Sequence, residues 1–133
     1  MNGFVAGTDT IKFINTAFGA ATGATGFTTA SVNENKAIAV GHGSIVELTG
    51  VNLTDLTVDA DGGAIENAII TAIDTIASGV YLIAINDNTG NIGLYDLATT
   101  ANGGAATTGN IAIELIGILN LVTDGALAAG NFV

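Results

Sequence analysis

The chain has 133 residues, enough for one domain of ordinary size and too few for two domains with separate cores. Hydrophobic residues make up 49% of the chain and charged residues only 11%, which excludes a solvated disordered tail. Twelve acids, two lysines and no arginine give a net charge of -10, so we expect no nucleic-acid partner. The longest apolar run, residues 111–122, contains Glu114 and Asn120 and is shorter than the roughly 20 residues of a membrane span, so we expect no membrane insertion.

Side chains that carry out chemistry are scarce. The absence of cysteine excludes thiol chemistry and disulfides, and one histidine, two lysines and three serines form no recognisable catalytic motif. We interpret His42, which lies between two glycines and next to Ser44, as a turn residue, because neighbours on an extended chain point to opposite faces. Glu47 and Glu114 occur in similar contexts, which indicates solvent-facing or interface positions on strands. We therefore expect no catalytic residue and no enzyme.

The shortage of charge also bears on the surface. A chain with so few charged residues must cover its exterior largely with Thr, Asn, Gly and Ala. Such a surface associates readily, and we expect a homo-oligomer or a polymer of this chain. The alternative is a monomer with many solvated threonines.

The first half of the chain predicts short strands separated by small residues. A turn at residues 7–9 leads into a short strand, and the small-residue stretch 19–29 predicts a loop. Segments 37–40 and 44–48 are β-branched and bounded by glycines, which predicts two brief strands around a glycine turn. Residues 54–58 predict another strand.

The next segment changes to a helical period and predicts an amphipathic helix over about residues 64–77. Asp61 is placed to serve as its N-cap, and Gly79 follows as a terminator. The apolar positions of this helix are Ile65, Ile69, Ala72, Ile73 and Ile76.

The last third of the chain predicts a hairpin over residues 79–97, with its turn at 87–91. Both strands of the hairpin are apolar on both faces, which is typical of central strands. A loop at 98–109 and a long strand at 111–119, paired with the hairpin, complete the expected elements. We therefore expect a single mainly β domain over residues 1–133, a β-sandwich or β-roll-like fold with one amphipathic helix.

Three segments resemble the C-terminal region of bacterial proteins exported by type I secretion, the group of RTX-type surface and surface-layer proteins. They are GFVAGTDTIKF at 3–13, the hairpin YLIAINDNTGNIGLYDL at 81–97 with IELIGI at 113–118, and the ending LAAGNFV at 127–133. The glycine-rich calcium-binding nonapeptide of that group is absent from the sequence, so calcium in a stacked β-roll is not implied.

This resemblance implies an extracellular, cell-surface location and a type I secretion transporter as a partner. The export signal of the group is C-terminal and uncleaved. The matching positions in this chain are Leu127, Asn131, Phe132 and Val133.

Oxygen-rich segments are the candidates for a cation. Asp55, Asp59 and Asp61 lie within seven residues and predict a metal site, with calcium as the expected ion. The alternative is that Asp61 caps the helix and Asp59 alternates on an exposed strand. Asp87, Asn88 and Asn91 form the other oxygen-rich turn, where the alternative is local backbone hydrogen bonding.

Together these inferences predict an extracellular structural protein that assembles with itself into a surface layer or filament after type I secretion. The alternative is a C-terminal secretion or capping module of a larger secreted enzyme or adhesin.

Overall fold

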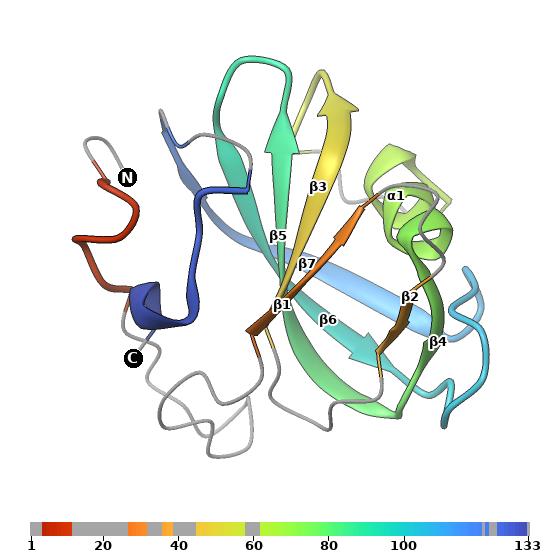
Figure 1. The fold of residues 1–133 in the computed structure, drawn as a ribbon. Coiled ribbons are helices and arrows are strands. Elements are labelled where there is room, and N and C mark those ends of the chain that lie inside the picture. The colour runs from red at the N-terminus through yellow and green to blue at the C-terminus, as the bar shows by residue number, and fades with distance from the viewer. Residues whose placement is uncertain are drawn as a thin grey trace.

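The computed structural model describes residues 4–11, 27–31, 36–38, 45–57, 62–120, 122 and 125–132. These residues are mainly β with a single α-helix, as the sequence predicts (Figure 1). The elements in chain order are β1 (Phe27–Ser31), β2 (Lys36–Ile38), β3 (Ile45–Leu53), α1 (Ala64–Ala72), β4 (Ile73–Ile76), β5 (Gly79–Asp87), β6 (Ile92–Thr99), β7 (Ile111–Leu119) and a short 3-10 helix, η1 (Ala129–Asn131).

Five strands form one mixed sheet in the order β1-β3-β5-β6-β7. β1, β3 and β5 are parallel, whereas β5, β6 and β7 are antiparallel. The predicted hairpin and its pairing with the last long strand are confirmed. β5 lies at the centre of the sheet and is buried on both faces from Tyr81 to Asn86, as expected of a strand that is apolar throughout.

The glycine-bounded strands form, but they do not lie together. β2 pairs with β4 in a separate two-stranded sheet, while β3 pairs with β1 and β5. The predicted strand at 54–58 is wrong over residues 54–57, because β3 already extends to Leu53 through Gly50, which has a φ of +73°. Only glycine adopts that conformation without strain, so the residue read as a strand boundary instead lies inside a strand.

Two other predicted boundaries also differ from the structure. The predicted loop at 19–29 is wrong from Phe27 onward, because residues 27–31 form β1. Small and polar residues such as Thr28 and Ala30 enter this strand because a parallel neighbour, β3, supplies their backbone partners. Such pairing between distant segments leaves no local sequence signal.

The predicted helix at 64–77 is too long at its C-terminal end. α1 ends at Ala72, and Ile73–Ile76 form β4, with Ile73 already at an extended φ of -116°. Isoleucine and threonine favour strands. Ile73 and Ile76 would be buried whether this segment were a helix or a strand, so their spacing does not distinguish the two. Pairing with β2 therefore fixes the strand.

The helix begins at Ala64 as predicted, but its cap differs from the expectation. Its N-cap is Gly63, which makes no side-chain cap, and the predicted cap Asp61 lies outside the described residues. Glu66, in the first turn, accepts a hydrogen bond from the backbone N–H of Gly62. This bond ties the residue before the N-cap to the first turn, one position outside the usual capping box.

The large sheet has two faces with different covers. α1 and β4 pack on one, the helix-side face, through Ile65, Ile69, Ile73 and Ile76. On the other, the terminal-side face, lie an N-terminal segment (residues 4–11) and a C-terminal segment (residues 125–132), both at the left of Figure 1. The buried side chains there are Phe4, Ile11, Ile45, Leu82, Ala84, Ile92, Leu94, Leu119, Val122, Leu127 and Phe132.

Candidate functional site

Part of the terminal-side face on β6 and β7 remains accessible, and we call it the open face. It carries Asp96, which is half-buried, with Ala98, Ala112 and Glu114, which are exposed. Ile116, beside them on β7, is 47% exposed. Because the register places Asp96 opposite Glu114 and Ala98 opposite Ala112, these four side chains form one continuous patch.

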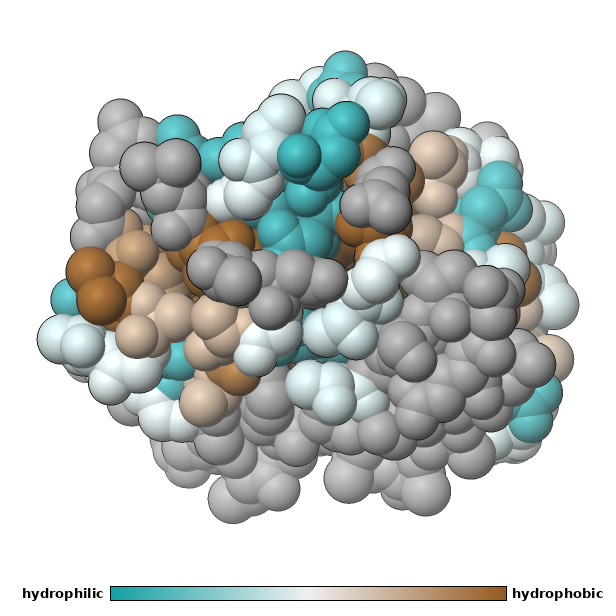
Figure 2. All heavy atoms as spheres, turned by 45° about the horizontal axis from the view of Figure 1, so that its top comes forward, coloured by the Kyte–Doolittle hydropathy of each residue, from teal (hydrophilic) through white to brown (hydrophobic). Residues whose placement is uncertain are grey.

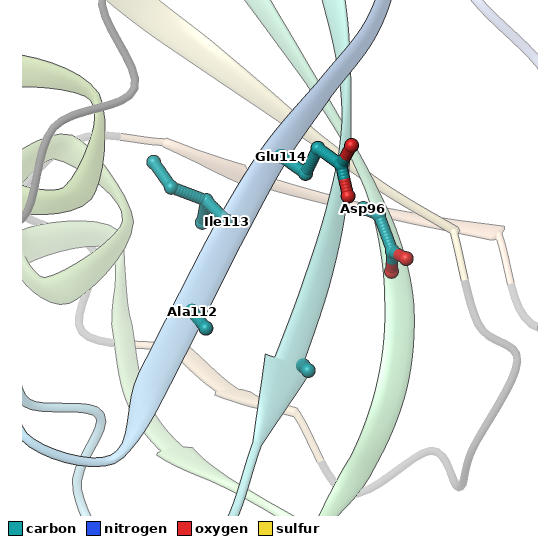
Figure 3. Close-up of a pocket in the computed structure, with 5 residues that line it drawn as sticks. Asp96, Ala112, Ile113 and Glu114 are labelled. Carbon is teal, nitrogen blue, oxygen red and sulfur yellow. The ribbon is translucent and has the colours of Figure 1, made fainter.

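A hollow of about 170 Å³ lies on the open face, lined by Asp96, Ala98, Ala112, Ile113 and Glu114. Figure 3 shows the Asp96 and Glu114 carboxylates on the same side of their strands, whereas Ile113 points away from them. A second hollow of about 450 Å³ adjoins it, sharing Ala98 and Ala112 and extending to Val80 on β5. The site is thus an acidic end joined to a surface of small and apolar side chains.

The two carboxylates are direct cross-strand partners, a position where side chains of like charge destabilise a sheet. Oδ1 of Asp96 is buried and has no hydrogen-bond partner among the described residues. Burial raises the pKa of Asp96, and the charge of Glu114 raises it further. Protonation of Asp96, or a cation held between the two carboxylates, would reduce both the repulsion and the cost of burying the charge.

Basic residues are rare in this chain. Of the two lysines, Lys12 lies outside the described residues and Lys36 lies on β2 in the other sheet. No salt bridge involving the Asp96–Glu114 pair is therefore observed within the described residues.

The turn between β5 and β6 binds its own carboxylate. Asp87 accepts hydrogen bonds from the backbone N–H groups of Thr89 and Asn91, both at 2.8 Å, and from their side chains at 2.8 and 2.9 Å. Burial favours a higher pKa for Asp87, but these hydrogen bonds outweigh it and lower the pKa to about 2. The carboxylate thus stabilises the turn, as residues of this type do.

The predicted metal site is only partly described. Asp55 is exposed, and its Oδ1 accepts hydrogen bonds from Oγ1 and N of Thr57 at 2.6 and 2.8 Å, which lower its pKa. Asp59 and Asp61 lie outside the described residues, and so does His42. Among the residues that are described, no three His, Cys, Asp or Glu side chains are grouped to hold a metal ion.

The positions assigned to an export signal form part of the folded core. Leu127, Asn131 and Phe132 are 4%, 1% and 2% exposed, and Val133 lies outside the described residues. Phe132 forms a parallel bridge with Ile11. In the folded state the three described side chains are therefore inaccessible to a transporter.

Glu47 and Glu114 share a sequence context but lie in different environments. Glu47 is 1% exposed on β3, where its Oε1 accepts a hydrogen bond from the N–H of Gly125 at 3.1 Å, whereas Glu114 is exposed. Two strands separate β3 from β7, which places the two strands roughly 14 Å apart across the sheet at about 4.8 Å per step. They do not form a catalytic pair.

Sequence reasoning missed Asp96, the partner that Glu114 does have. The signal was present in part, because the predicted strands 79–97 and 111–119 were adjacent in the expected sheet. The sequence did not give the register between these strands, and a shift of one residue moves every side chain to the other face of the sheet.

Comparisons of the chain with protein-family models, with curated proteins and with solved structures find no match. Within the described part of the chain, the one α-helix is too short to cross a membrane.

Proposed function

We propose that this chain is an extracellular structural protein that assembles with copies of itself into a surface layer or filament after type I secretion, assisted by calcium. The observation that carries the proposal is the open face, where small and apolar side chains adjoin the Asp96–Glu114 pair. This surface offers contact area to a second copy, but its charge opposes contact until a cation neutralises it.

Electrostatics makes the expected assembly conditional. Copies with a net charge of -10 repel one another over a Debye length of about 8 Å in physiological salt. Divalent ions bind carboxylate oxygens at about 2.3–2.6 Å, and two opposed carboxylates supply the first ligands of such a site. Ligands from a second copy would complete the coordination, which couples calcium binding to association.

Sedimentation velocity of the full chain in millimolar Ca²⁺ and in chelator tests this proposal. We expect larger species with Ca²⁺ and monomer with chelator. The Asp96→Asn variant should lose most of this dependence, whereas Asp74→Asn, which removes one charge from an exposed position on β4, should keep it. A wild-type chain that stays strictly monomeric at high concentration in both conditions would exclude self-assembly.

Calorimetry identifies where calcium binds. If the ion binds at the open face, Asp96→Asn should weaken its affinity and the double variant Asp55→Asn, Asp59→Asn should not. The opposite result would assign calcium to the site predicted from Asp55, Asp59 and Asp61.

The second candidate function is a C-terminal secretion or capping module of a larger secreted enzyme or adhesin. The favouring observation is that Phe132 and Asn131 contact the N-terminal segment, so an upstream domain would attach beside the proposed signal. A coding frame that continues for hundreds of residues upstream of Gly3 would favour this function. Retention of a chain lacking residues 127–133 in cells that carry a type I transporter, with expression level measured in parallel, tests the export step common to both.

A further inference from the structure

The C-terminal segment, residues 125–132, is attached to the rest of the molecule mainly by inserted side chains. Leu127 and Phe132 are 4% and 2% exposed and belong to the terminal-side core together with Ile45, Leu82 and Leu94. The segment is not a strand of the five-stranded sheet; its bridge is to Ile11 in the N-terminal segment. It therefore fills a preformed apolar surface without extending the backbone ladder.

Asn131 holds this segment in place. Its Nδ2 donates to the carbonyl of Asp9 at 2.8 Å, and its carbonyl accepts from the N–H of Ile11 at 2.6 Å. Its Oδ1 accepts from the N–H of Ala128 at 3.0 Å, which closes the short turn that contains η1. Two apolar anchors and one polar clamp thus lie within six residues, a compact unit that recognises one acceptor surface.

Apart from the open face, the described residues expose few large apolar side chains. Among the described residues, the exposed large hydrophobic side chains are Val5 at 54% and Ile116 at 47%. Brown and pale side chains lie together on the left flank of Figure 2, the side on which Figure 1 places the two terminal segments. Val5 lies in the N-terminal segment, which forms the bridge to the C-terminal segment through Ile11.

We propose that copies of this chain join by exchange, the segment 125–132 of one copy occupying the terminal-side core of the next. This inference rests on the proposed self-assembly and specifies which segments of two copies would contact each other. Exchange reuses contacts that already exist within one chain, so it needs no new apolar patch. Donation from each copy to the next builds an open filament, whereas reciprocal donation closes a dimer.

Concentration sets the balance between the closed and exchanged forms. A tethered segment competes at an effective concentration that is about millimolar for short flexible connections. Dilute chains therefore remain closed, and exchange becomes competitive when copies accumulate at a surface.

Locking the segment in its own chain tests the proposal. The chain contains no cysteine, and Ile11 and Phe132 are partners in a parallel bridge, whose Cα atoms are separated by about 4.8 Å, within disulfide range. The double variant Ile11→Cys, Phe132→Cys is oxidised as a dilute monomer, then concentrated in Ca²⁺ beside the same protein in reductant. Wild-type protein is concentrated in parallel, because Phe132→Cys itself removes an anchor of the segment. We expect at least tenfold less assembled protein in the oxidised variant than in wild type.

The outcomes separate the two proposals. Assembly of the oxidised variant at the wild-type level would overturn exchange and leave self-assembly intact. A wild-type chain that never assembles overturns the proposed function itself.

Competition with a peptide tests exchange in the wild-type chain and so does not depend on folding of the cysteine variant. A synthetic peptide of residues 122–133, in excess during wild-type assembly, should fill acceptor surfaces and reduce assembled protein about tenfold. The same peptide carrying Phe132→Ala should have little effect. If both peptides act equally, or neither acts, exchange is excluded.

Discussion

The two faces of the large sheet are covered in different ways. The helix-side face is covered by α1 and β4, regular elements that connect β3 to β5. The terminal-side face is covered over part of its area by two segments from opposite ends of the chain, and the rest is the open face. A crossover between parallel strands has to pass over a face of the sheet, whereas terminal segments are free to leave it.

This difference puts both proposals on the same face of the sheet. The helix-side face contains large side chains at full burial, among them Tyr81, Tyr95 and Ile69. The candidate calcium pair and the proposed exchange segment both belong to the terminal-side face. Elements of low local stability are the ones from which mobile binding segments are drawn.

The largest expected effect comes from removing the anchor of the C-terminal segment. Phe132→Ala should lower the free energy of unfolding by roughly 3–5 kcal/mol, the range for truncating a buried phenylalanine. Hydrogen exchange should accelerate most at Ile11, whose N–H donates to the carbonyl of Asn131 beside the bridge, and least in α1. Equal acceleration in α1 would contradict the separation of the two faces.

On the helix-side face, Gly93→Ala should destabilise the protein by roughly 1–3 kcal/mol through overpacking. The added Cβ would lie 2.6 Å from Oη of Tyr95, which is fully buried and donates a 2.6 Å hydrogen bond to the carbonyl of Leu56. Gly117→Ala on the neighbouring strand is the control, because a Cβ there meets nothing within 4 Å. Chemical denaturation should therefore show a lower free energy of unfolding for Gly93→Ala than for Gly117→Ala. An equal decrease in both variants would contradict this packing.

Asp87→Ala should destabilise the hairpin by about 1 kcal/mol, because the turn loses the acceptor of four hydrogen bonds. Its folded pKa of about 2 lies below the ordinary value of 3.8, so its contribution is present above pH 3.8 and is lost as pH falls toward 2. Urea denaturation from pH 5 to pH 2 should show a steeper loss of stability in the wild type than in the variant. Parallel curves would show that the turn does not depend on this carboxylate.

The smallest expected effect has the opposite sign. Asp96→Asn should stabilise the chain at neutral pH by about 0.2–1 kcal/mol, because it removes one of two opposed charges. The folded pKa of Asp96 is raised, so its unfavourable contribution is present above that pKa and disappears as pH falls toward 3.8. The stability difference between variant and wild type should therefore vanish in acid, and thermal melts at pH 7 and pH 3.5 measure it. A difference that persists at pH 3.5 would point to packing instead of charge.

The sequence by itself determined the β class, the helix start region and the hairpin of β5 and β6 with its Asp87 turn. These features have local causes: alternation, glycine placement and side chains that bond their own backbone. It also indicated that Ile111–Leu119 would pair with the hairpin, because few residues separate β6 from β7.

Only the tertiary structure decided which strands pair and which faces are covered. Ile73–Ile76 fit a helix by spacing and became β4 through pairing with β2. Glu47 and Glu114 share the pattern Glu-Leu-x-Gly, yet β3 lies inside the sheet and β7 at the end of its strand order, so one is buried and the other exposed. Register likewise set Asp96 against Glu114. Contacts between residues distant in the chain fix these features, and a local pattern carries no information about such contacts.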